Sequence, residues 1–342
     1  MIYSIFPKHT ATVYERYPDM NTSKDEILEL NKIVSSSLVV GTYNTKILLD
    51  FGLAELSASN SASGIIADKY SLTLYTANAN ININSSTYQI SDVSAPWSPG
   101  LGRSTHNPKT NVGVSWSHPS SSNSVWPGDP NPHVGSSELN FGTFKTDLTA
   151  DVTPLVNSVK VSAATDNGIL VSRTITEMAD GNKYGYVNFY SAETSTIYKP
   201  RLGVYYDDSD HTTGSLTALD PSADYYVYQV NNPGTYKINS TPKFRFTGRE
   251  KYPTATYTAS TAALVEYLPT SSYYSLVDVR TGDTVVPFDT TYTKISCDAT
   301  GNFANLKLSG LYPKRLYQFN IRVDHNGTST YHILDDMFRV YE

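Results

Sequence analysis

The sequence predicts an all-β protein that folds as two β-sandwiches. Apolar and polar residues alternate with a period of two in most segments, which is the pattern of strands with one buried face. Tyrosine is unusually frequent, with 27 copies among 342 residues, and aromatic side chains favour pleated surfaces. Clusters of Gly, Pro, Asn and Asp separate the alternating segments, as turns do.

The alternating segments give the expected strands in chain order. In the N-terminal part they are residues 46–51, 70–76, 87–93, 168–173, 186–190 and 201–206. In the C-terminal part they are residues 225–230, 243–247, 274–279, 293–297, 304–308, 317–323 and 336–341.

Helix signals are scarce. A short helix is expected at residues 154–159, because Thr153 can cap it and Pro154 suits a first helical position. Residues 23–32 are ambiguous: Ser23 and Glu26 have the spacing of a capping box, but the segment around Leu28 also alternates. We favour a strand there, because its surroundings are all β.

Two polar stretches interrupt the strand pattern. Residues 97–142 form a long loop region that holds all three tryptophans, and loops of this length are usually functional or packed on themselves. Residues 208–222 begin in a polar, strandless run and are interpreted as a linker. We therefore expect a sandwich at residues 1–207 and a second sandwich at residues 223–342.

The second sandwich has a local signature. Gly310-Leu311-Tyr312-Pro313 leads into Tyr317-Gln318-Phe319-Asn320-Ile321. This resembles the tyrosine corner of fibronectin type III and immunoglobulin-like sandwiches, in which a Tyr near the start of a strand bonds back to the preceding turn.

Charge and composition exclude several classes of protein. The net charge is −6 and no basic stripe is present, so we expect no direct nucleic-acid binding. No run approaches the ~20 apolar residues that cross a bilayer, and the N-terminus lacks a signal-peptide pattern, so no membrane insertion is expected. A single cysteine, Cys297, rules out an intrachain disulfide framework and is interpreted as a core residue. Together these features favour assembly in a reducing cytoplasm.

No catalytic motif is present. The chain lacks a nucleophile elbow, a phosphate-binding glycine loop and a zinc-protease motif, and its seven histidines are dispersed. A glycosidase would need two facing carboxylates, which no motif supports. We therefore expect no enzyme, no cofactor and no metal. The acidic residues 207–210 could be an oxygen-ligand calcium site or a solvated linker, and we favour the linker.

The tryptophans are the main candidates for contacts with a partner. Trp116 lies in an alternating segment and is expected in the core. Trp97 and Trp126 are flanked by prolines, so they could stack on sugar rings or fill a partner's pocket, or they could pin the loop to the sandwich. Trp97, Trp126 and His133, in the same loop, are the candidate interaction residues.

Several phrases of the first two-thirds occur in the order of a known family. They are Thr10-Ala11-Thr12-Val13-Tyr14, Asn21-Thr22, Lys46-Ile47-Leu48-Leu49-Asp50-Phe51, Ala67-Asp68-Lys69-Tyr70-Ser71-Leu72, Asp151-Val152-Thr153, Asn167-Gly168-Ile169-Leu170 and Phe189-Tyr190-Ser191-Ala192-Glu193. In this order they resemble the DNRLRE-type β-sandwich, which is related to carbohydrate-binding modules of bacterial surface proteins. The resemblance implies a jelly-roll type of sandwich for residues 1–207.

A second set of phrases extends over nearly the whole chain. They are Gly100-Leu101-Gly102-Arg103, Gly113-Val114-Ser115-Trp116, Asp224-Tyr225-Tyr226-Val227-Tyr228, Pro287-Phe288-Asp289 and Gly310-Leu311-Tyr312-Pro313. They resemble virion structural proteins of tailed bacteriophages of the myovirus type. The resemblance implies a non-enzymatic particle component in neck, tail, baseplate or fibre.

Such a component would be assembled in the host cytoplasm and would work through contacts with other virion proteins (neck, tail, portal-side or fibre components). We expect a homo-oligomer of closed symmetry, with neighbours at strand edges and at the long loop. The alternative is a carbohydrate-binding or adhesion module that recognises a cell-surface glycan through the loop tryptophans.

Overall fold

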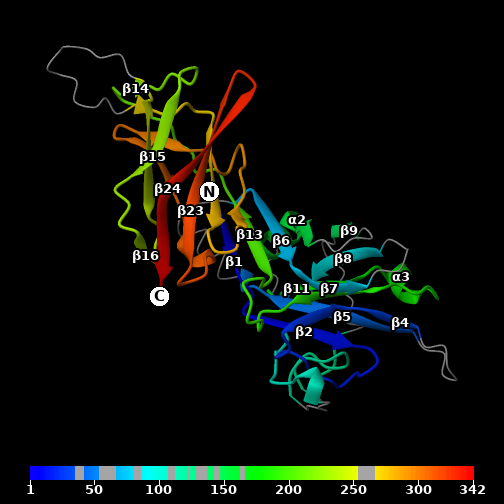
Figure 1. Ribbon diagram of the computed structural model, residues 1–342. Helices are drawn as coiled ribbons and strands as arrows, with labels where there is room; N and C mark the ends of the chain where they lie inside the picture. The colour runs from blue at the N-terminus through cyan, green and yellow to red at the C-terminus, as the bar shows by residue number, and fades with distance from the viewer. Residues whose placement is uncertain are drawn as a thin grey trace, which may run out of the picture. The chain divides into compact units, whose positions relative to one another are not determined.

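The computed structural model describes most of the chain as two compact units (Figure 1). It describes residues 1–34, 42–53, 67–80, 86–106, 112–121, 123–127, 137–141, 147–161, 166–252 and 266–342. One unit is Ile5–Gly203, and the other combines Met1–Ser4 with Val204–Glu342. Nearly all regular structure is β-strand, so the predicted all-β fold class is confirmed. None of the described helices is both long and apolar enough to cross a membrane.

Sheets of unequal size build the unit Ile5–Gly203. The largest has the order β2 (His9–Tyr14), β5 (Thr42–Asp50), β11 (Ile169–Arg173), β8 (Ser86–Asp92) and β9 (Ser137–Phe141), and β4 (Lys32–Val34) also pairs with β5. A three-stranded sheet has the order β3 (Ile27–Leu30), β12 (Tyr186–Tyr190) and β7 (Thr76–Asn80). The remaining sheet has the order β1 (Ile2–Ile5), β13 (Arg201–Tyr205), β6 (Lys69–Leu74) and β10 (Leu148–Asp151). The boundary between the units falls within β1 and within β13.

Strand β11 lies at the centre of the largest sheet. All five of its residues are buried, and Ile169 pairs with Leu49 of β5 and with Asp92 of β8. Gly168 precedes the strand with φ of 90°, and an added Cβ would lie 2.4 Å from the Leu49 carbonyl oxygen. The glycine is therefore required by the close approach of two backbones.

The ambiguous segment 23–32 contains a strand. Strand β3 pairs with β12 through Leu28↔Phe189 and Leu30↔Val187. Leu28 and Leu30 are fully buried on one face, which a period of two satisfies and a helical period does not. The strand interpretation is confirmed.

Helices are few and short in the described chain. The expected helix is present as α2 (Thr153–Val161), and a one-turn helix α3 (Ile175–Ala179) follows β11. The Thr153 hydroxyl accepts a hydrogen bond from the Tyr70 backbone N–H at 2.8 Å, so it ties the helix start to β6. A 3₁₀ turn, η1 (Ser104–His106), interrupts the long loop, and a second, η2 (Leu308–Gly310), precedes the tyrosine-corner turn.

A single buried amide holds the long loop against the sandwich. The Asn21 side chain is fully buried between β2 and β3. Its Nδ2 donates to the carbonyl oxygens of Pro99 and Val114, at 2.6 and 2.7 Å, and its Oδ1 accepts from the Gly102 backbone N–H at 2.7 Å. One side chain thus satisfies three backbone groups from two separate stretches of loop.

The Asn21 side chain and its three hydrogen bonds to the backbone of Pro99, Gly102 and Val114 are named the Asn21 clamp. Three glycines make room for it. An added Cβ would lie 2.2 Å from the Asn21 carbonyl oxygen at Gly102, 2.8 Å from its Oδ1 at Gly100 and 2.6 Å from its Nδ2 at Gly113. Gly100 and Gly113 also have positive φ, of 74° and 103°. The glycines of the two loop segments that begin at Gly100 and at Gly113 are therefore explained by close packing around the Asn21 side chain.

The second unit is a sandwich of two sheets. One has the order β14 (Thr217–Ala218), β18 (Glu266–Tyr267), β17 (Lys243–Glu250), β22 (Gly301–Asn305) and β21 (Ser296–Asp298), and β15 (Tyr225–Val230) also pairs with β17. The other has the order β16 (Thr235–Lys237), β24 (Thr328–Tyr341), β23 (Leu316–His325), β19 (Ser272–Asp278) and β20 (Thr284–Val286). Figure 1 shows β23 and β24 as a long hairpin near the C-terminus. Phe244, Phe319 and Phe338 pack in the centre of the core.

The first residues of the chain complete this second core. Ile2 is 3% exposed within the cluster. The Met1 α-amino group donates to the Tyr206 carbonyl oxygen at 2.6 Å and lies 2.5 Å from the Asp208 carboxylate. An added Cβ at Gly310 would lie 2.3 Å from the Ser4 carbonyl oxygen, so the Gly310 turn is shaped to receive this segment.

The boundary region differs from a simple linker. Leu219, within the predicted linker 208–222, is 2% exposed and belongs to the second core. His211 forms an isolated bridge with Cys297, and Thr217–Ala218 forms β14. Residues 208–222 therefore belong to the second unit, and so do Met1–Ser4. The alternation of apolar and polar residues does not mark this boundary between the units.

The tyrosine corner is present. Tyr317, at the start of β23, donates its hydroxyl to the Tyr312 carbonyl oxygen at 3.0 Å and accepts the Tyr312 backbone N–H at 2.8 Å. The Tyr317 ring is buried and lies 5.8 Å from that of Phe338. The turn is therefore tied to both the strand and the core.

Replacing Asn21 by Ala is expected to destabilise the first unit by at least about 2 kcal/mol, because three buried backbone groups lose their partner. All three tryptophans lie in this unit, so their fluorescence in a urea titration reports its unfolding. Asn157→Ala on the exposed side of α2 is the matched control. An unchanged urea midpoint of unfolding for Asn21→Ala would contradict the stabilising role of the Asn21 hydrogen bonds.

Replacing Tyr317 by Phe is expected to lower the unfolding free energy of the second unit by about 1–2 kcal/mol, because the ring stays while both hydrogen bonds are lost. Scanning calorimetry of the full chain measures this loss. Tyr226→Phe removes a hydroxyl from a ring that is 47% exposed, and is expected to change little. Equal effects of the two variants would argue against the corner.

Candidate functional site

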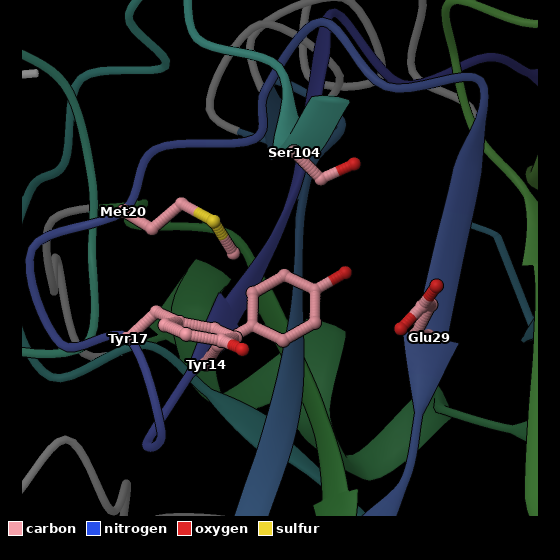
Figure 2. A pocket seen from close by; sticks show the side chains of 5 residues that line it. All are labelled: Tyr14, Tyr17, Met20, Glu29 and Ser104. Carbon is pink, nitrogen blue, oxygen red and sulfur yellow. The ribbon is translucent and has the colours of Figure 1, made fainter. Parts of the chain in front are cut away.

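In the unit Ile5–Gly203, two pockets lined by described residues share part of their walls. The larger, which we name the Tyr14 pocket, has a volume of about 400 Å³ and is lined by Tyr14, Tyr17, Met20, Glu29 and Ser104 (Figure 2). The second has a volume of about 180 Å³. Its walls are made by Tyr14, Arg16, Tyr17, Glu29, Asn31, Ile33, Tyr43, Asn44 and Thr45.

Three side chains of the Tyr14 pocket come from the end of β2 and the turns after it. Tyr14 is the last residue of β2. The Tyr17 N–H donates to the Tyr14 carbonyl oxygen at 3.1 Å, and the Met20 N–H donates to that of Tyr17 at 2.9 Å. These two turns bring both rings and the Met20 thioether to one wall of the pocket.

Glu29 is held on the opposite wall by β3. Its backbone N–H donates to the buried Thr12 hydroxyl at 3.0 Å, and its carbonyl oxygen accepts from the Thr45 hydroxyl at 2.7 Å. In Figure 2 the Tyr14 hydroxyl points across the pocket toward the Glu29 carboxylate. The position of Glu29 therefore depends on two threonines from neighbouring strands.

The long loop supplies the rim. The Ser104 backbone N–H donates to the two Asp25 carboxylate oxygens, at 3.1 and 3.2 Å. The Lys24 N–H donates to the Gly102 carbonyl oxygen at 3.0 Å. Because Asn21 holds the same stretch at Gly102, the clamp places Ser104 over the pocket.

Burial perturbs the two titratable groups that face each other in the pocket. Burial raises the pKa of Glu29 above its usual value, the hydrogen bond from Tyr14 partly offsets this, and the negative charge of Asp25 raises it further. Burial also raises the pKa of Tyr14 far above its usual value, with the charges of Glu29 and Asp25 adding to the effect. The Tyr14 hydroxyl is therefore a fixed hydrogen-bond donor to Glu29 at neutral pH.

The arrangement is suited to binding. Aromatic rings and a thioether give apolar surface, and a carboxylate and hydroxyls give a few directed polar groups, as small-molecule pockets do. Within the described residues, no group of three or more His, Cys, Asp or Glu side chains is placed to hold a metal ion.

The structure places the candidate tryptophans away from this pocket. Trp126 is 4% exposed, packs with Val114 and Leu48, and donates its indole N–H to the Ser115 carbonyl oxygen at 3.2 Å. Trp97 packs on the same cluster and donates to the Asn167 carbonyl oxygen at 2.8 Å. The sequence left open whether these two tryptophans contact a ligand or partner or attach the long loop to the sandwich. The hydrogen bonds and packing of both indoles attach the loop.

The remaining sequence candidates fall elsewhere. Trp116 packs against the same cluster, and the Lys46 ammonium lies 4.6 Å from the centre of its ring. His133 lies outside the described residues, so its interaction role stays a prediction. In the acidic residues 207–210, Asp207 accepts from the Ser209 N–H at 2.9 Å and Asp208 pairs with the Met1 amine, so the chain itself uses these carboxylates.

Sequence reasoning did not find the Tyr14 pocket. Its residues come from β2, β3 and η1, and no spacing rule brings these segments together. No local signal marked it: Glu29 stands between Leu28 and Leu30, where a polar residue follows the ordinary alternation of a half-buried strand.

Comparisons with known proteins add little. No family model matches the chain, and none of the curated proteins matches it. Among solved structures it is similar to a DUF4785 family protein from Legionella pneumophila, with 8% identity and a TM-score of 0.19 over 100% of this chain. The chain spans 64% of the length of that protein. A TM-score this low does not establish a shared fold.

Replacing Glu29 by Gln is expected to stabilise the first unit at neutral pH. The folded-state pKa of Glu29 is raised, so ionisation above that pKa penalises the folded state, and the wild-type unit loses stability as pH rises from about 4.5 through the raised value. The variant's advantage should therefore grow across this window and disappear below it. Tryptophan-monitored urea titrations from acid to neutral pH measure this difference. An advantage independent of pH would contradict the assignment.

Proposed function

We propose that this chain is a non-enzymatic structural component of a tailed-phage virion, acting through protein–protein contacts in a symmetric assembly. Contacts of that kind need exposed surfaces that another protein can cover. The open edge of β24 is the observation that carries this proposal.

The first part of strand β24, residues 328–333, is paired on one side only. Strand β23 pairs with residues 328–333 and, after an irregularity, with residues 337–339, while β16 pairs only with Arg339, Val340 and Tyr341. Among the described residues, no other strand pairs with residues 328–333. This segment contains no charged residue and no proline, which are the usual protections of an edge strand.

Large apolar side chains accompany the open edge. Tyr331 and Ile333, two residues apart on the strand, are 61% and 69% exposed. Tyr331 packs edge-on against Phe288, with ring centres 5.8 Å apart. Exposed apolar groups on a rigid strand are typical anchors of protein interfaces.

The tailed-phage resemblance of the sequence supports the same proposal and supplies the particle context. The glycine phrases within it have a physical basis in the Asn21 clamp. Neck, tail, baseplate and fibre remain equal alternatives for the position on the particle.

The glycan-binding alternative has less support. It was attached to Trp97 and Trp126, and the indole of Trp126 is buried while that of Trp97 is hydrogen-bonded within the unit. Because Trp126 is buried, these two side chains do not form a joint exposed platform for sugar rings. Glycan arrays with the purified chain remain its test.

The proposal predicts that the purified chain forms a defined oligomer, or that many copies are found by mass spectrometry in intact phage particles. Light scattering measures the mass in solution. The double variant Tyr331→Ser, Ile333→Ser should lower the oligomer mass, because it removes the exposed anchors of the open edge.

The matched control is Leu101→Ser, which removes an apolar side chain that is 82% exposed in the other unit. It should leave the mass unchanged. A wild-type monomer that is missing from particles would overturn the proposal. If the double variant forms the same oligomer as the wild type, the contact between copies lies elsewhere and does not involve the β24 edge.

A further inference from the structure

We propose that the Tyr14 pocket binds a small organic ammonium ion, held by the Glu29 carboxylate and by the rings of Tyr14 and Tyr17. This inference goes beyond the proposed structural role and does not depend on it. Its basis is the combination of shape, apolar lining and charge in one cavity.

The cavity has the size and lining for alkylated nitrogen. Its volume of about 400 Å³ lies in the range of small-molecule sites. Two tyrosine rings and the Met20 thioether form polarisable walls, and Met20 is buried while Tyr17 is half exposed. Aromatic faces attract the positive charge of an ammonium group, and the thioether packs against its carbon atoms.

The charge of the cavity is negative. Within the described chain, Glu29 takes part in no ion pair, and the charged group that most affects it is another carboxylate, Asp25. The Tyr14 hydroxyl supplies Glu29 with a hydrogen bond but no positive charge. A bound cation would compensate this partly desolvated carboxylate, whereas a neutral ligand such as a sugar would leave its charge unbalanced.

One cationic side chain, that of Arg16, lies beside this wall. Its guanidinium lies 5.5 Å from the centre of the Tyr17 ring. Arg16 is exposed and lines the second pocket but not the Tyr14 pocket. The Tyr17 ring therefore already has one cation beside it, from a residue of the second pocket, and Figure 2 shows the Tyr14 and Tyr17 side chains across the larger cavity from Glu29.

The same chemistry could come from two sources. One is a free alkylammonium compound, and the other is the side chain of a lysine presented by a protein. Both bring a nitrogen-centred positive charge with attached carbon atoms. The experiment therefore uses one probe for each source.

Calorimetric titration of the full chain with choline tests the first source, and titration with Nα-acetyl-lysine amide tests the second. The neutral isostere of choline, in which carbon replaces the nitrogen, and the Nα-acetyl amide of 2-aminoheptanoic acid, in which a methyl group replaces the lysine ammonium, have nearly the same shapes without the charge. Binding of at least one charged probe, with its neutral counterpart at least about tenfold weaker, is the expected result.

Variants assign the binding to the pocket. Glu29→Gln keeps the shape and should weaken the bound probe about tenfold or more. Tyr17→Leu should weaken it by roughly three- to tenfold, because the ring interaction is lost. Glu26→Gln removes a carboxylate from an exposed position three residues away and should leave the affinity within about twofold, since exposed charges are screened.

Several outcomes would overturn the inference. These are no binding of either charged probe at tens of millimolar, equal binding of charged and neutral probes, or affinity that Glu29→Gln does not change. Since Glu29→Gln is expected to stabilise the fold, loss of binding in this variant would not come from unfolding. Binding confined to the lysine probe would identify a protein side chain as the ligand, and binding confined to choline would identify a quaternary ammonium compound.

Discussion

The buried amide of Asn21 is the interaction on which the first unit depends. It joins two stretches of a long loop to the connection between β2 and β3 through three short hydrogen bonds. Without these bonds, loop backbone groups would be buried with no partner, which is the arrangement that folded proteins avoid. The three glycines around the amide exist because no other residue leaves room for it. The clamp also brings Trp126 to the small core cluster and Ser104 to the rim of the Tyr14 pocket.

The second unit is organised by a different constraint, the closure of its core around the first residues of the chain. Ile2 fills part of that core, and the turn at Gly310 is shaped by the Ser4 backbone. The same turn continues into the tyrosine corner, where Tyr317 binds the backbone of Tyr312. The two features lie side by side in the sequence near residue 310, so the corner and the N-terminal segment support one another.

The two surfaces with functional potential are different in kind. The open edge of β24 at residues 328–333 carries no Asp, Glu, Lys or Arg and exposes Tyr331 and Ile333, and it suits another protein. The Tyr14 pocket is concave, aromatic and negative, and it suits a small cation. The two surfaces belong to different units, so the two proposals can be tested independently of each other. The tryptophans, which composition alone makes conspicuous, serve mainly to hold the loop in place.

The sequence by itself determined the all-β class, the short helix at α2 and the tyrosine corner, while the strand at residues 27–30 was favoured over a helix only by its surroundings. Each of these depends on spacing within about ten residues, where periodicity and turn chemistry act directly. Only the tertiary structure decided that Trp126 is buried, that Met1–Ser4 belongs to the second core and that Glu29 faces Tyr14. These outcomes depend on contacts between segments far apart in the chain: Asn21 reaches Val114, and Ile2 packs in a core built from residues beyond 218. A local sequence pattern indicates that a residue is buried. Which residues bury it depends on packing between segments that are distant in the chain.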